Sequence, residues 1–249
     1  MVDLLKILSW IYFSSFGIGL LSVFLARWRI PILLKYGKTL VDQKHQNDGM
    51  FDILLHLTVP KEWFRHFYIL SSCLSIINLW SSMNLVSLLV AFHSFRRVYE
   101  THYVNRFGKR SRMHISHYLV GLWFYTSLNV AVAISSTSHQ THSIGSRLFL
   151  IALFSLASFD QYKNHLHLSH LVKYTLPQYG LFQVVTSAHY FDEVLIYLSL
   201  ASYTGTAEMY CCFAWVLGNL SISAIETREW YAKKFPSKTP PYAILPYLL

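Results

Sequence analysis

The sequence predicts an all-α fold, a bundle of about seven helices that cross a membrane. Hydrophobic residues make up 53% of the 249 residues and charged residues only 13%, against about 25% charged residues in soluble domains. The apolar residues gather in long runs that short polar segments separate. When these runs are taken as membrane spans, 19 of the 21 Lys and Arg residues fall on one side.

The first span is the clearest. Residues 7–26 are 20 positions without a charge, which is long enough to cross a bilayer. The run ends at Arg27-Trp28-Arg29, which indicates a cytosolic stop with an interfacial aromatic residue. A signal peptide would have a shorter apolar run and a cleavage site with small residues.

Six further apolar runs follow, and they predict the remaining spans. They are residues 66–80, 83–101, 115–134, 144–160, 191–204 and 207–225. Brief polar turns near residues 81–84 and 203–205 divide two pairs of short spans, so six or five spans remain alternatives. No internal repeat divides the chain, and we expect one integral-membrane domain over residues 1–249.

The distribution of positive charge predicts the orientation. Seven spans place four segments on the basic side: 27–65, 102–114, 161–190 and 226–249. Only Lys6 and Arg147 fall on the other side. The positive-inside rule then makes the N-terminus lumenal or exterior and the C-terminus cytosolic. We expect a cytosolic loop over 27–65, with Pro60 as the first residue of the helix that follows it.

The net charge of +9 does not indicate a nucleic-acid partner. The basic residues lie at span ends, where they meet anionic lipid headgroups, and no basic stretch is long enough for a solvated groove. The three cysteines lie in apolar runs and are expected to be small packing residues. Nothing in the sequence indicates a stable protein partner.

Four polar clusters lie at the expected cytosolic edge of the spans. They are His93–Glu100, Asp160–His170, Ser187–Glu193 and Glu226–Tyr231. Ionisable groups at membrane depth are costly and are functional candidates. Arg97 and its neighbours suit either a helix salt bridge at a membrane stop or a nucleotide phosphate, and the pattern leaves both open. The convergence of four clusters on one side predicts a site for a soluble cofactor.

Two other classes of protein are less favoured. The 13 histidines suggest a di-iron desaturase or hydroxylase, but few of them have a ligand spacing, such as His114/His117 and His167/His170, so we expect no metal site. A transporter or a scaffold is disfavoured because transport would need polar residues at mid-span, where this chain is apolar.

Motifs along nearly the whole chain resemble the steroid 5α-reductase family. The general marks are Gly180-Leu181-Phe182, then His189-Tyr190-x-x-Glu193, and the terminal Ala243-x-x-Pro246. Further matching stretches are Val59 to Tyr68, His93 to Thr101, Ser116-His117-Tyr118-Leu119-Val120-Gly121 and Gln161-Tyr162-Lys163-Asn164-His165. The last two point to the polyprenal reductase branch, most closely its fungal members.

The resemblance implies a seven-span enzyme of the endoplasmic reticulum that uses NADPH to reduce a carbon–carbon double bond conjugated to a carbonyl. Within the branch, the substrate would be a long-chain polyprenal, reduced in its α-isoprene unit to supply dolichol for N-glycosylation. By position in the motifs, the cofactor-side residues would be Arg97, Gln161, His165, His189, Glu193 and Tyr231.

Two departures from the family pattern concern the group that polarises the carbonyl. Steroid-reducing members have a Tyr two to three residues before the Arg of the first cluster, where this chain has Ser94 and Phe95. They also have a Gln-Glu pair before the Val-Pro step, where this chain has Leu55-His56. These departures favour a polyprenal over a steroid. Reduction of a steroid or another enoyl-type substrate is the alternative function. The expected candidates for the carbonyl donor are Tyr190, His66 and His56.

Overall fold

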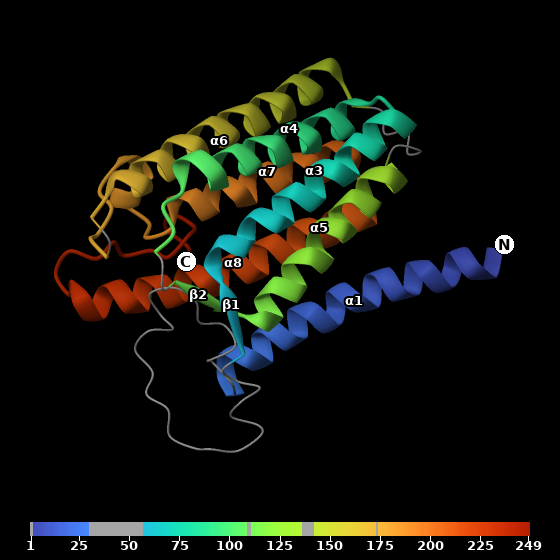
Figure 1. Cartoon of the computed structure of the whole chain (residues 1–249). Helices are drawn as coiled ribbons and strands as arrows, with labels where there is room; N and C mark the ends of the chain where they lie inside the picture. Colours follow the sequence, from blue (N-terminus) through green and yellow to red (C-terminus); the bar gives the residue numbers. More distant parts are fainter. Residues whose placement is uncertain (1, 30–56, 109–110, 136–141, 173) are drawn as a thin grey trace.

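The computed structural model describes residues 2–29, 57–108, 111–135, 142–172 and 174–249, and these residues form one helical bundle (Figure 1). Its helices are α1 (Val2–Arg29), α3 (Phe64–Ser81), α4 (Leu85–Tyr99), α5 (Ile115–Ser135), α6 (Ile144–His170), α7 (Ala188–Thr204) and α8 (Ala207–Lys234). Each apolar run of the sequence lies on one helix. The predicted all-α bundle is therefore confirmed.

The helices differ in their length and hydropathy. By length and composition, α1, α5, α6 and α8 are long and apolar enough to cross a membrane. The shortest is α4, whose 15 residues would span about 22 Å, less than the ~30 Å of a hydrocarbon core. It continues, however, into a π-helical turn at Glu100–Val104, which lengthens the helical segment at its polar end.

The two pairs of short spans, α3 with α4 and α7 with α8, are separate helices rather than two long tilted helices. Between α3 and α4, Ser82 is extended, and the Asn84 side chain accepts a hydrogen bond from the Ser87 amide at 2.9 Å to begin α4. Between α7 and α8, Gly205 adopts the left-handed conformation (φ 64°) that a glycine accepts without a steric penalty. These breaks favour seven spans over six or five.

The packing order of the helices determines which of them surround the interior. α3 packs on α4 and α5, α6 on α7, and α7 on α8, which also contacts α5 and α1 (Figure 1). Arg27 near the end of α1 forms ion pairs with Glu226 and Glu229 of α8. The interior therefore lies among α3–α8, and α1 covers α8 from outside.

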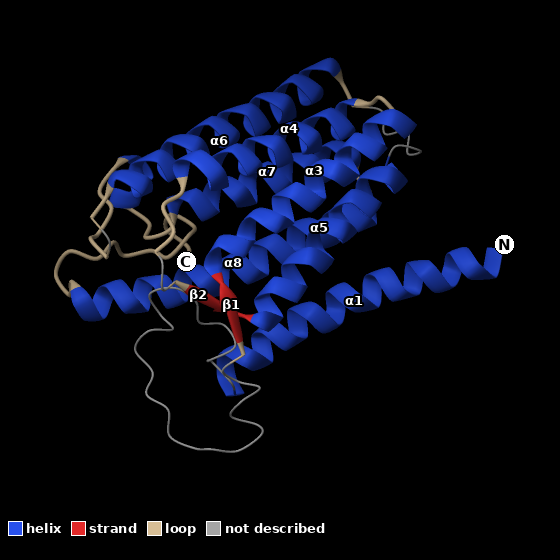
Figure 2. Cartoon of the chain, in the orientation of Figure 1, coloured by secondary structure: helices blue, strands red, loops and turns tan. Residues whose placement is uncertain are grey.

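A small antiparallel sheet precedes α3 (Figure 2). Strand β1 (Thr58–Pro60) pairs with β2 (Arg112–His114), and the Lys61 amide then donates to the Ser111 carbonyl at 2.9 Å. A 3-10 turn at Lys61–Trp63 leads into α3. The prediction that Pro60 begins the helix was wrong, because this pairing keeps Pro60 extended. The expected loop over 27–65 falls largely on residues 30–56, outside the described part.

The segments 161–190 and 226–249 meet at one end of the bundle. The chain after α8 folds back so that the Thr186 amide donates to the Tyr242 carbonyl at 3.0 Å. The side chain of Ile244 is fully buried there. Figure 1 places this end beside the last turns of α4 and α6 and the end of α1.

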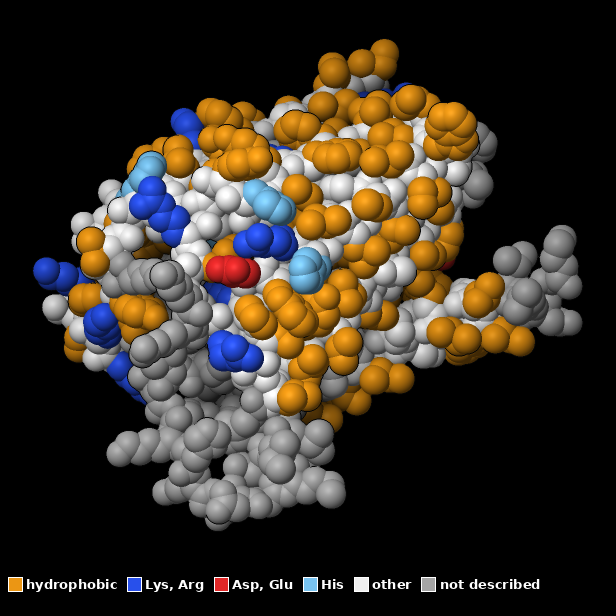
Figure 3. Space-filling model, in the orientation of Figure 1, with side chains coloured by type: hydrophobic (Ala, Val, Ile, Leu, Met, Phe, Trp, Pro, Cys, Tyr) orange, Lys and Arg blue, Asp and Glu red, His pale blue; other side chains and the backbone are white. Residues whose placement is uncertain are grey.

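The outer surface of the bundle is apolar. Large side chains that point outward include Trp10, Ile18, Trp80, Phe149 and Leu156. In Figure 3 apolar side chains are spread over the visible face of the helices, and several Lys and Arg side chains gather toward the end with the loops. Outward apolar surfaces on several helices suit a protein whose solvent is lipid.

Candidate functional site

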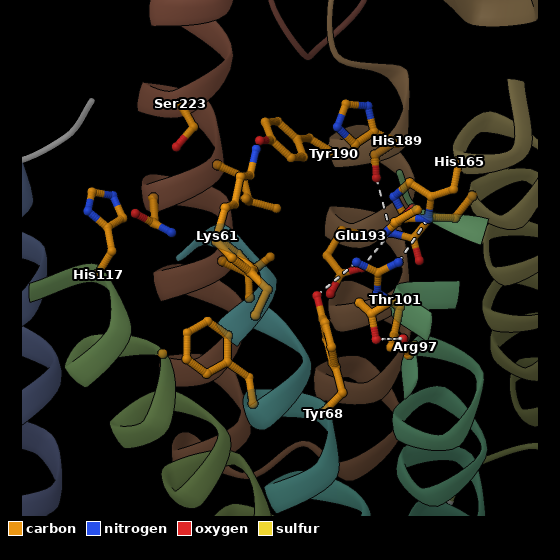
Figure 4. A pocket seen from close by; sticks show the side chains of 18 of the residues that line it. Lys61, Tyr68, Arg97, Thr101, His117, His165, His189, Tyr190, Glu193 and Ser223 are labelled. Atoms are coloured by element: carbon orange, nitrogen blue, oxygen red, sulfur yellow. Dashed lines mark hydrogen bonds between the residues drawn. The ribbon is translucent and has the colours of Figure 1, made fainter. Parts of the chain in front are cut away.

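A cavity of about 390 Å³ lies inside the bundle, within the usual range of roughly 300–1,000 Å³ for ligand pockets. Residues of α3, α4, α5, α6, α7 and α8 all line it. Figure 4 shows that side chains from both sides of the bundle point into it. Its two sides differ in chemistry, and we call them the polar wall and the apolar wall.

The polar wall is formed by α4, α6 and α7. It consists of Arg97, Gln161, His165, His189 and Glu193. Gln161 and His165 are four residues apart on α6, and His189 and Glu193 are four apart on α7, so each pair shares one helix face. α6 packs along α7, which brings the two faces together.

Glu100 organises one half of the polar wall. Its carboxylate is fully buried and accepts hydrogen bonds from both Arg96 and Arg97. His165 Nδ1 lies 2.7 Å from Glu100 Oε2 and 2.8 Å from Arg97 Nη1. Arg97 Nη2 also donates to the Tyr68 hydroxyl at 2.8 Å. Of the two uses that the sequence left open for Arg97, the salt bridge is present, while Arg97 also faces the cavity.

Gln161 connects this half to Glu193. Its Nε2 atom donates to the Glu193 carboxylate and, at 3.1 Å, to the His189 carbonyl. Its Oε1 atom accepts a hydrogen bond from Arg96 at 2.5 Å, and His93 Nε2 lies 3.4 Å from Glu193. Two arginines thus balance two carboxylates. Such pairing is what makes charged groups tolerable in an interior.

The apolar wall is formed by α5 and α8. Its apolar members are Val120, Gly121, Phe124, Trp215, Val216 and Leu220. A Cβ atom on Gly121 would come within 2.5 Å of the Phe67 ring, so only glycine leaves this wall its present shape. The few polar groups on this side are those of His117, Tyr125, Asn219 and Ser223. The wall therefore suits an apolar ligand or an apolar part of one.

Two further cations, Lys61 and Arg106, also line the cavity. Lys61 points into it from the turn before α3 (Figure 4). Its enclosure disfavours the charged ammonium and lowers the pKa of Lys61 to about 8. Cations suit phosphate groups, and the amide, imidazole and carboxylate groups of the polar wall suit ribose and carboxamide. These residues fit a dinucleotide with its phosphates toward Lys61 and Arg106.

Comparison with known proteins identifies the family of this chain. Residues 113–249, more than half of the chain, match the model of the 3-oxo-5-alpha-steroid 4-dehydrogenase family. A polyprenal reductase of Saccharomyces cerevisiae is 40% identical over 99% of this chain and 98% of its own length. The chain belongs to this steroid dehydrogenase family, in the branch of the polyprenal reductases.

More distant relatives have the same name. A polyprenal reductase of Drosophila melanogaster is 26% identical over 83% of this chain and 82% of its own. That of Caenorhabditis elegans is 27% identical over 88% of this chain and 87% of its own. The resemblance inferred from the motifs is confirmed. The protein is an oxidoreductase that acts on CH–CH groups, and reductases of this kind imply a nicotinamide cofactor.

The fold brings most of the predicted site residues of this family member to one place. Arg97, Gln161, His165, His189, Glu193 and the catalytic candidate Tyr190 all line the cavity. Tyr231 does not line it; its hydroxyl donates to the Thr175 carbonyl at 3.3 Å. His66 also lies outside the lining, with Nδ1 3.1 Å from the Tyr118 hydroxyl. His56 lies outside the described residues, and the roles of all three stay predictions.

Sequence reasoning did not single out Lys61 and Tyr68 as site residues. A usable signal was present, since Lys61, Phe64 and Tyr68 have the i, i+3, i+7 spacing of one helix face and all line the cavity. Ser94 and Phe95, which occupy the place of the steroid-type tyrosine, do not line it. Ser94 is fully buried with its hydroxyl 2.7 Å from that of Ser71, and Phe95 is 48% exposed.

Metal ligands do not gather in the described part of this family member. Among those residues, no three His, Cys, Asp or Glu side chains lie close enough together to hold an ion. His114, from one of the pairs with ligand spacing, has its Nδ1 atom 2.7 Å from the Ser116 hydroxyl.

Proposed function

We propose that this protein is an NADPH-dependent polyprenal reductase, which reduces the double bond in the α-isoprene unit of a long-chain polyprenal. The observation that carries the proposal is the cavity with one polar and one apolar wall. A dinucleotide needs the first wall and an isoprenoid the second. The name of the yeast relative, 40% identical over 99% of the chain, supports the same substrate class.

Each group of residues has a role in this proposal. Bound NADPH supplies a hydride for the β carbon of the enal. Gln161, His165, His189 and Glu193 hold the nicotinamide end, and Tyr231 contacts a part of the cofactor beyond the cavity. The apolar wall holds the first isoprene units and limits the access of bulk water to the reacting atoms. For the carbonyl donor, Tyr190 lines the cavity, whereas His66 lies outside its lining.

The preference for NADPH over NADH rests on the cations of the site. NADPH has a 2′-phosphate that NADH lacks, and a guanidinium donates to a phosphate through two parallel hydrogen bonds. Arg97, with Arg96 beside it, is the predicted partner. Because Arg97 already donates to Glu100 and Tyr68, we include Lys61 and Arg106 as further contacts for phosphates.

We further propose an endoplasmic reticulum location, with the N-terminus lumenal and the C-terminus cytosolic. The product then supplies dolichol synthesis and so N-glycosylation. The bundle supports this orientation, since α1, α4 and α8 have basic residues in their last turns, at the end with the site. A C-terminal tag on sealed microsomes should be digested by added protease. A protected tag would contradict the orientation.

The function is tested with purified protein in detergent or liposomes. Polyprenal, polyprenol and a 3-oxo-4-ene steroid are supplied side by side, each with NADPH or NADH. We expect reduction of the polyprenal with NADPH, at least tenfold faster than with NADH or with the steroid. Equal or faster reduction of the steroid would replace the proposed substrate, and no reduction of any of them would contradict the proposal.

A further inference from the structure

The proposed reaction needs a hydrogen-bond donor at the carbonyl oxygen, and Tyr68 has the position for it. As the β carbon gains a hydride, the electrons of the double bond move toward the carbonyl oxygen, where a donor must stabilise the negative charge. This donor must lie where the polar and apolar walls meet, because the nicotinamide occupies one side and the isoprene units the other. Among the described residues, three tyrosines line the cavity: Tyr68, Tyr125 and Tyr190.

Tyr68 lies at the boundary of the two walls. It belongs to α3, which packs on α4 of the polar wall and on α5 of the apolar wall. Its ring makes a T-shaped contact with Tyr125 of α5, with ring centroids 5.2 Å apart. Its hydroxyl accepts a hydrogen bond from Arg97 of α4 at 2.8 Å. Figure 4 shows this hydroxyl pointing into the cavity, below Glu193.

The surroundings of the hydroxyl prepare it to donate. Within the described residues its only hydrogen bond is the one it accepts from Arg97, so its own proton is available to a ligand. The Arg97 guanidinium also stands over the ring, 4.7 Å from the centroid. That cation stabilises the charge on the phenol oxygen as the proton moves toward a substrate. The ring is only 6% exposed, which fixes its direction.

We propose that Tyr68 is the catalytic residue that donates a proton to the aldehyde oxygen of the polyprenal. The inference rests on the proposed function and names the donor for that reaction. The β carbon takes the hydride, the nicotinamide is oxidised, and the carbonyl oxygen takes the Tyr68 proton to give an enol. The enol then returns this proton to Tyr68 while its α carbon accepts a proton from a water molecule. The products are the saturated aldehyde and a hydroxide ion, which a proton from the solvent neutralises.

The test compares Tyr68→Phe with a matched control, Tyr197→Phe. Tyr197 is fully buried on α7, does not line the cavity, and has a hydroxyl with no partner among the described residues. We expect Tyr68→Phe to lower kcat by about 100-fold or more, the usual contribution of a proton donor. The dissociation constant of NADPH and the melting temperature should remain close to those of wild type. Turnover by Tyr68→Phe within threefold of wild type would overturn the proposal.

A second measurement needs no turnover. Polyprenal labelled with ¹³C at its carbonyl is bound to the enzyme with NADP⁺, and the carbonyl stretching band is recorded. In wild type and Tyr197→Phe the band should lie at lower wavenumber than in Tyr68→Phe, because the hydroxyl polarises the bond. The same band in all three proteins would overturn the role of Tyr68. Failure of wild type to bind or reduce polyprenal would contradict the proposed function instead.

Variants of the other two tyrosines of the cavity test whether another hydroxyl is the donor. Tyr125→Phe and Tyr190→Phe remove the competing hydroxyls one at a time. Both should retain more than about a tenth of the wild-type kcat. A larger loss in either than in Tyr68→Phe would assign the donor to that residue. If Tyr68→Phe fails to fold, the same two variants decide: high turnover in both supports Tyr68, and a 100-fold loss in either overturns it.

Discussion

The polar and apolar walls of the cavity are built in opposite ways. In the polar wall the charged groups and the Gln161 amide are linked to one another: Arg97 binds Glu100, Gln161 binds Glu193, and His165 lies within reach of both Arg97 and Glu100. The apolar wall depends on shape, with Gly121 leaving space beside Phe67 and with Phe124 and Val216 buried around it.

This difference indicates how each wall recognises its ligand. A preformed network presents fixed dipoles and charges, which suits a cofactor of constant structure. A smooth apolar surface gains binding energy in proportion to the apolar area that is buried and does not require a fixed pattern of polar groups on the ligand. Changes in the polar wall should therefore alter cofactor binding and chemistry, and changes in the apolar wall should alter lipid binding alone. Four predictions test this separation.

The largest effect is expected from Glu193→Gln and His189→Ala. Glu193→Gln removes the negative charge beside Gln161 and His93, and breaking a buried charged pair costs about 3–5 kcal/mol. His189→Ala removes an imidazole ring from the lining of the cavity. Turnover should fall by at least about 100-fold, while the amount of protein in membranes is unchanged. Glu208→Gln, at the opposite end of α8, is the control and should behave as wild type. Near-normal turnover in either site variant would make this block of residues structural only.

Arg97→Lys should weaken NADPH binding by about 1–3 kcal/mol, the range for hydrogen bonds to charged groups. A lysine cannot donate to Glu100, Tyr68 and a phosphate in the geometry of a guanidinium. Turnover is measured against the concentration of each nucleotide, with Arg147→Lys at the far end of the bundle as the control. If wild type uses NADH and NADPH equally, Arg96 and Arg97 serve as topology anchors and not as a phosphate site.

Gly121→Ala should affect the lipid and not the cofactor. The new methyl group would press on the Phe67 ring and narrow the apolar wall, at a cost of about 1 kcal/mol. We expect a severalfold rise in the KM for polyprenal and an unchanged dissociation constant of NADPH. In the control Gly145→Ala the nearest atom to the added carbon is 4.0 Å away. A change in NADPH affinity as large as the change in KM would mean that the walls do not act separately.

The smallest effect is a dependence of NADPH affinity on pH. The pKa of Lys61 is lowered to about 8 by its enclosure, so the ammonium is present below pH 8 and is lost as the pH rises through it. NADPH should therefore bind less tightly at pH 9 than at pH 7, by less than tenfold. Lys61→Met should remove this dependence and Lys6→Met should retain it. A wild-type affinity that is constant from pH 7 to pH 9 would exclude Lys61 from phosphate binding.

Periodicity and charge predicted most of the fold and part of the site. The helices could be predicted because the length of each apolar run and the breaks at Asn84 and Gly205 can be read from neighbouring residues. Arg97, Gln161, His165, His189 and Glu193 were found because their motifs resemble a family, and helix spacing then placed them on common faces.

Other features depend on contacts that the sequence does not reveal. The strand at Pro60 exists because residues 112–114, about 50 positions later, pair with it. Tyr68 lies in an apolar stretch that is typical of packing residues, and its significance comes from Arg97 on a different helix. Tyr231 and His66 were predicted as site residues, but their side chains contact Thr175 and Tyr118 and do not line the cavity.

The division of the cavity between cofactor and lipid is tested most directly by an experimental structure of the enzyme with NADP⁺ and polyprenal. The account predicts the nicotinamide ring against Gln161, His189 and Glu193, and the first isoprene units between α5 and α8. The aldehyde oxygen should lie within hydrogen-bond distance of the Tyr68 hydroxyl. A nicotinamide against Phe124 and Val216, or an isoprenoid chain along α6 and α7, would contradict the account.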